Sequence, residues 1–175
     1  MNKFIAFMEK HFIPIASKIG SQRHLVAIRD GFIVTMPLMI LGSFGVLINN
    51  LPIPAYIDFM NGIFGEGTWQ AFGNNLSAGT FSILALLIAF TVSYNLAKSY
   101  DQDALGAGAI SVASFFALGA MATDADGLLT AAGLGSQGLF LALIVAIIST
   151  EIFRLLAVNP RLGINMPDVV PPAVS

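Results

Sequence analysis

The sequence predicts an all-α polytopic membrane protein, with an amphipathic N-terminal helix, four transmembrane helices and a cytoplasmic N-terminus. Four long stretches contain no charged residue, and the shortest has 20 residues, about the length of helix that crosses a bilayer. In the whole chain 56% of residues are hydrophobic and 10% are charged, whereas an ordinary soluble domain has roughly 25% charged residues. Lysine and arginine also gather at one predicted side of the spans. A water-soluble fold is therefore excluded.

Residues 1–30 are predicted to form a cytoplasmic amphipathic segment. At about 100° per residue its apolar side chains share one narrow helix face: Phe4, Met8, Phe12, Ile15 and Ile19. Such a stripe, flanked by basic residues, is typical of a helix lying in the headgroup layer. The residues predicted to contact the membrane surface are Lys3, Lys10, Lys18, Arg23 and Arg29. A soluble helix packed beneath the spans is the alternative, and Pro14 is expected to kink or split the helix.

The membrane domain is expected over residues 31–158. Its four spans are predicted at about 31–50, 76–97, 104–121 and 138–158. The aromatic-rich segment between the first two spans is predicted to be an interfacial hairpin in which Pro54 begins a short helix. Residues 159–175 are expected to start a cytoplasmic-side loop and to be truncated.

The charges between the spans predict the orientation. The two loops expected outside carry only acidic residues, namely Asp58, Glu66, Asp124 and Asp126. The remaining basic residues fall at the other ends of the spans, at Lys98, Arg154 and Arg161. By the positive-inside rule, the N-terminus and residue 175 are both cytoplasmic.

Two features inside the spans concern packing. Ala109, Ala113 and Ala117 recur every four positions in the third span, a stripe that lets another helix approach closely. Packing within the chain is its simplest interpretation, and contact between subunits is the alternative. Glu151 and Arg154 are three residues apart, so they can pair on one helix face. We interpret them as a structural ion pair near the cytoplasmic end, with a functional role as the alternative.

Several classes of chemistry have no support in the chain. There is no cysteine, so disulfides, thiolate nucleophiles and most zinc sites are ruled out. His11 and His24 stand in no arrangement that would make either a catalytic base. We expect no catalytic residue, no metal site, no cofactor and no nucleic-acid partner.

Two segments resemble a known family. Residues 18–32 read KIGSQRHLVAIRDGF and are followed by TMPLMI at 35–40 and GS at 42–43. Near the other end, NMPD at 165–168 is followed by PPAV at 171–174. Both segments resemble enzyme IIC, the membrane permease of the bacterial sugar phosphotransferase system, in its lactose/cellobiose (diacetylchitobiose) family.

The resemblance implies a multi-pass permease of the bacterial cytoplasmic membrane. Such proteins take up β-linked disaccharides of the cellobiose, diacetylchitobiose or lactose type. The sugar is phosphorylated by the phosphocysteine of a separate IIB component, which receives its phosphoryl group from phosphoenolpyruvate through IIA. Family members are homodimers whose first half builds the interface and whose second half holds the sugar. The chain is thus expected to be the N-terminal, interface-forming part of the permease, and a self-contained four-helix membrane scaffold or small channel is the alternative.

The second motif contains the only candidate substrate or gate contacts. Asn165 and Asp168 are polar residues of that motif, and a structural turn capped by Asp168 is the competing interpretation. The family pattern has glycine after the Pro-Asp pair, whereas this chain has Val169. A β-branched residue disfavours a positive φ angle, so the turn is expected to be altered.

Overall fold

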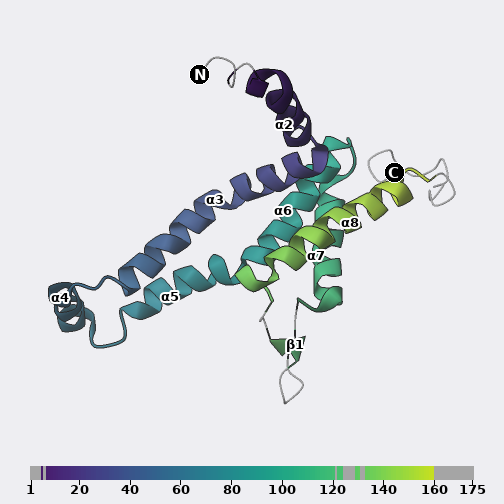
Figure 1. The fold of residues 1–175 in the computed structure, drawn as a ribbon. Helices are drawn as coiled ribbons and strands as arrows, with labels where there is room; N and C mark the ends of the chain where they lie inside the picture. The colour runs from purple at the N-terminus through teal and green to yellow at the C-terminus, as the bar shows by residue number, and fades with distance from the viewer. Residues whose placement is uncertain (1–4, 6, 121, 124–128, 131–132, 160–175) are drawn as a thin grey trace, which may run out of the picture.

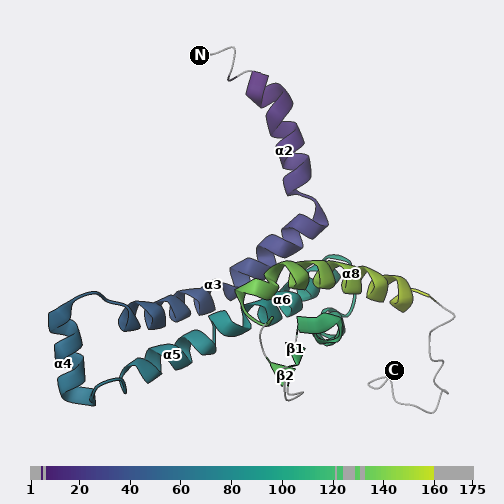
Figure 2. The same cartoon turned by 60° about the horizontal axis from the view of Figure 1, so that its bottom comes forward.

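The computed structural model describes residues 5, 7–120, 122–123, 129–130 and 133–159. Its helices form two parts, seen in Figures 1 and 2. A bundle contains α6 (Leu84–Ser99), α7 (Ala104–Phe115) and α8 (Leu139–Ala157). The long helix α3 (Arg23–Asn49) packs along α6 and continues beyond the bundle beside α5 (Gln70–Ala78). We use the name arm for three elements, namely α4 (Pro54–Phe64), α5 and the part of α3 beyond Met39.

The N-terminal helix projects away from the rest of the protein (Figures 1 and 2). A π-helical segment, η1 (Met8–Phe12), leads into α2 (Ile13–Gly20), so the helical pattern changes next to Pro14. This is the expected disturbance, because proline provides no backbone donor. No residue of α2 is buried, and the apolar side chains of Phe12, Ile15 and Ile19 are more than half exposed. Packing of α2 beneath the spans, the alternative interpretation, is therefore not observed.

The first long helix begins earlier than the predicted span at residue 31. Gln22 has extended backbone (ψ 130°) and separates α2 from α3, which then runs without interruption from Arg23 through Pro37. Small residues line the face of α3 that meets the rest of the chain, and one of them, Ala27, lies before residue 31. The buried residues of α3 are Ala27, Gly31, Thr35, Gly42 and Gly45.

The segment after α3 turns the chain back along the arm. Pro54 occupies the first turn of α4 (Pro54–Phe64), as predicted. Proline is tolerated there because the backbone N–H that it lacks would have no partner within the helix. The predicted hairpin is shorter than expected, however, because the returning helix begins at Gln70 rather than near residue 76. A break at Thr80 and a 3₁₀ turn, η2 (Phe81–Ile83), separate α5 from α6.

The third predicted span is the shortest helix of the bundle. It comprises α7 and a π-helical extension, η3 (Phe116–Ala120). The chain then forms a small antiparallel pair, β1 (Ala122–Thr123) with β2 (Leu129–Thr130). A 3₁₀ turn, η4 (Ser136–Gly138), leads into α8.

Small residues and hydroxyl groups hold the bundle together. Fully buried alanines of α6 and α8 pack against Phe115. Between the helices, Ser93 Oγ donates to the Ala107 carbonyl over 2.9 Å and lies 2.6 Å from Thr150 Oγ1. Ser111 Oγ donates to the Ala89 carbonyl over 2.9 Å. Hydroxyls that hydrogen-bond across helices are typical of close packing between membrane helices.

Candidate functional site

Five polar and charged side chains from three separate segments meet at one end of the bundle. We name them the Glu151 cluster, which consists of Arg23, His24, Tyr100, Glu151 and Arg154. The first two residues open α3, Tyr100 directly follows α6, and the last two lie near the end of α8. The cluster therefore joins the start of one helix to the ends of two others.

The carboxylate of Glu151 is the acceptor at the centre. The Tyr100 hydroxyl donates to its Oε1 over 2.7 Å, and His24 Nε2 lies 3.0 Å from the same oxygen. Arg154 donates to Oε2 from Nε over 3.1 Å and from Nη2 over 2.8 Å. Both carboxylate oxygens are thus used, and the two charge-assisted bonds from Arg154 converge on Oε2.

Two guanidinium groups flank Tyr100. Its ring centroid is 4.9 Å from Arg23 Cζ and 4.5 Å from Arg154 Cζ, both within cation–π range. Arg23 Nη1 also donates to the Ser99 carbonyl over 3.1 Å, which places positive charge at the C-terminal end of α6. Burial, and then the hydrogen bond to Glu151, raise the pKa of the Tyr100 phenol. Tyr100 therefore stays protonated at neutral pH and acts as a donor.

The cluster is suited to holding helices in register rather than to chemistry. Each charged group already has a partner within it, and none of the five is a nucleophile activated by a free base. The predicted Glu151–Arg154 contact is confirmed. Sequence reasoning missed His24 and Tyr100 as its partners, because they come from other helices. The available signal was that all five residues lie on the predicted cytoplasmic side.

The other residues predicted from the sequence lie apart from this cluster. Lys10 and Lys18 are exposed on the N-terminal helix. Arg29 Nε is 2.8 Å from Asp30 Oδ1, in an exposed pair of neighbours. Lys3, Asn165 and Asp168 fall outside the described residues, as does Val169.

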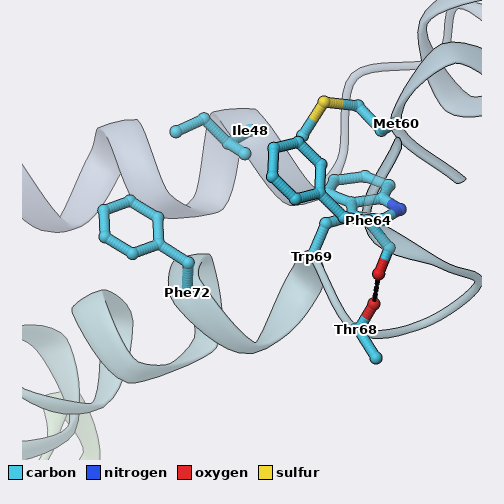
Figure 3. A pocket seen from close by; sticks show the side chains of 6 residues that line it. All are labelled: Ile48, Met60, Phe64, Thr68, Trp69 and Phe72. Carbon is cyan, nitrogen blue, oxygen red and sulfur yellow. Dashed lines mark hydrogen bonds between the residues drawn. The ribbon is translucent and has the colours of Figure 1, made fainter. Parts of the chain in front are cut away.

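A second feature lies at the far end of the arm, where a cavity of about 530 Å³ opens between α3, α4 and α5. Figure 3 shows the side chains that line it, among them the rings of Phe64, Trp69 and Phe72. The residues that line it are Ile48, Met60, Phe64, Thr68, Trp69 and Phe72.

The lining of this cavity is poorly suited to a sugar. The Trp69 indole already donates to Asn61 Oδ1 over 2.8 Å, and the Thr68 hydroxyl donates to backbone carbonyls. A ligand rich in hydroxyls needs several convergent polar groups. The cavity instead presents an apolar surface at the tip of the arm.

The fold and the apolar helices define the class: a multi-pass, α-helical membrane protein. Three helical stretches are long and apolar enough to cross a membrane, Arg23–Asn49, Gln70–Ser99 and Ser136–Ala157, and Ala104–Leu118 is a shorter apolar helix. Residues 29–175 match the family described as "Phosphotransferase system, EIIC". The chain belongs to this family, whose members lie in the bacterial cytoplasmic membrane.

Individual relatives place the chain more closely. It is 45% identical over 186 residues to the lichenan permease IIC component of Bacillus subtilis and 44% identical over 186 residues to the cellobiose-specific EIIC component of Geobacillus stearothermophilus. Both matches cover 100% of this chain but 41% of the relative. The crystal structure of the transporter ChbC, the IIC component of the N,N′-diacetylchitobiose-specific phosphotransferase system, has a TM-score of 0.84 and 43% identity over 96% of this chain and 41% of that one. The chain thus corresponds to the N-terminal portion of such permeases.

Proposed function

We propose that this chain is the N-terminal, interface-forming part of a phosphotransferase-system permease for a β-linked disaccharide of the cellobiose or diacetylchitobiose type. The sugar site belongs to the part of the permease that follows residue 175, and a IIB component supplied by IIA phosphorylates the sugar. The substrate class follows from the relatives, whose names specify lichenan, cellobiose and N,N′-diacetylchitobiose.

The exposure of α3 is the observation that carries the interface role. Within the described chain this helix buries only small residues, against α5 and α6. Three of its larger side chains, Ile28, Phe32 and Met39, are partly buried against the bundle. Many of the others remain exposed, including Ile33, Val34, Ile40, Phe44 and Leu47. The arm is two helices wide, so one of its faces is free to meet a second copy. A standard interface buries about 800 Å² per partner, which a helix about 40 Å long can provide.

Cross-linking tests this role. The chain has no cysteine of its own, and Phe72 on the arm and Phe140 at the start of α8 are 65% and 75% exposed. In membranes we expect Phe72→Cys to give cross-linked dimers with a short bis-maleimide, whereas the matched control Phe140→Cys stays monomeric. Dimers from Phe140→Cys alone, or from neither variant, would contradict an interface on the arm.

We further propose the N-in orientation, with α7 as the fourth, shortest crossing. Lys10 and Lys18 on the N-terminal helix then face the anionic cytoplasmic headgroups, each contributing about 1 kcal/mol of attraction when held near the surface. Glu66, beyond α4, lies outside the cell.

The orientation predicts a labelling pattern. A membrane-impermeant maleimide added to intact spheroplasts should modify Glu66→Cys and leave Ser21→Cys unmodified until the cells are lysed, because only the former faces outward. Both positions are exposed, so access to the protein surface is matched. Labelling of Ser21→Cys before lysis would refute the N-in orientation.

A further inference from the structure

An apolar groove runs between α7 and α8 on the outside of the bundle. Two adjoining cavities of about 180 and 150 Å³ form it, and both are lined by Ser114, Ser149 and Ile152. It extends along α8 from Leu141 to Leu156, roughly 22 Å at 1.5 Å per residue. We name it the α7–α8 groove, and its length suits a helix lying across most of a bilayer.

The small-residue stripe of α7 lies beside this groove. Ala109, Ala113 and Ala117 are all exposed, whereas Ala107, Ser111 and Phe115 make the contacts with the bundle. The simplest sequence interpretation, packing of the stripe within this chain, is therefore wrong for the described residues. Ala113 adjoins Ser114 along the helix, so a helix in the groove could approach α7 closely.

The groove contains two serine hydroxyls with little or no hydrogen bonding. Ser114 makes no hydrogen bond within the part of the chain that the structure describes, and Ser149 makes only a 3.4 Å bond to the Ala146 carbonyl of its own helix. By contrast, the three fully buried hydroxyls between the bundle helices, those of Ser93, Ser111 and Thr150, all have short bonds. Polar groups at membrane depth need partners, which an acyl chain cannot provide.

We propose that the α7–α8 groove receives a transmembrane helix from the part of the permease that follows residue 175, with hydrogen bonds to Ser114 and Ser149. This rests on the proposed function. The relatives are more than twice as long as this chain, which covers 41% of them, so their remaining length needs a packing surface. Only 28% of the α8 spanning window is buried here. The arm, which we propose meets a second copy, is a different surface. The groove is therefore available to a later helix of the same polypeptide.

The test uses the longer permease in native membranes, with a diazirine amino acid at Ser114 or, as a second variant, at Ala113. After irradiation and digestion, mass spectrometry should find residues 104–120 joined to a peptide that follows residue 175 of the same polypeptide. A probe at Phe140, which is 75% exposed and outside the groove, should give lipid adducts. Lipid adducts from the groove positions, or links to a second copy, would overturn the proposal.

Sugar uptake, measured on the same membranes, separates the two claims. If the unmodified longer protein takes up cellobiose while the groove probes yield only lipid adducts, the groove assignment is wrong and the proposed function stands. If the unmodified protein takes up no β-disaccharide, the proposed function is wrong. A groove probe joined to a following helix in that case still supports the packing assignment itself.

Discussion

Replacing Gly45 by valine should lower the free energy of unfolding by about 2 kcal/mol, within the range for overpacking a close contact. A Cβ at Gly45 would lie 2.8 Å from the Gly73 carbonyl oxygen, and one at Gly73 would lie 2.6 Å from the Gly45 carbonyl oxygen. Because both obstacles are backbone atoms, no rotamer change relieves them, and α3 and α5 must move apart. Denaturation in detergent, followed by circular dichroism, measures the change.

The matched control for this prediction is Gly62→Val in α4. A Cβ at Gly62 meets nothing within 4 Å, so the substitution tests valine in a helix without a clash. We expect its stability to change by less than about 0.5 kcal/mol, since valine is no worse a helix former than glycine. Equal losses at Gly45 and Gly62 would show that α3 and α5 are not in close backbone contact.

Removing the Glu151 carboxylate should have the second large effect. In Glu151→Ala, Tyr100 and Arg154 lose their acceptor and His24 loses its partner. A hydrogen bond to a charged group contributes about 1.5–3 kcal/mol, and because the cluster is only partly buried we expect a total loss of about 2–3 kcal/mol. Glu151→Gln keeps an acceptor oxygen and should lose less. The same detergent unfolding assay measures both variants.

The exposed pair of Arg29 and Asp30 is the control for this second effect. Its partners are neighbours on one helix and tie no other element, so Asp30→Asn should leave the unfolding midpoint unchanged. If Glu151→Ala also left it unchanged, the cluster would not be joining α3, α6 and α8.

The sequence predicted the helical membrane class because long uncharged stretches have few alternatives in a bilayer. It predicted Pro54 as a helix start for a similarly local reason. The start of α3 at Arg23 and of α5 at Gln70 was missed, because charged or polar residues end a hydropathy window but not a helix. The break at Thr80 and the 3₁₀ turn η2 were also missed, because no proline or charged residue marks them in the sequence.

Contacts between distant segments were harder to predict. The spacing of Ala109, Ala113 and Ala117 defined a helix face correctly, but spacing cannot say which neighbour that face meets. The Glu151–Arg154 pair was found because both residues share one helix. His24 and Tyr100 were not, since only the packing of α3 and α6 against α8 brings them to the same carboxylate.

The most direct test of the proposed function is sugar uptake in cells that lack their own β-disaccharide permease and are supplied with IIA and IIB. Cells with the longer protein that contains these residues should take up and phosphorylate cellobiose or diacetylchitobiose. Cells with residues 1–175 alone, expressed to the same level in the membrane, should take up neither. Saturable uptake by residues 1–175, or no uptake of any β-disaccharide by the longer protein, would contradict the assignment of this chain as the interface-forming part of a sugar permease.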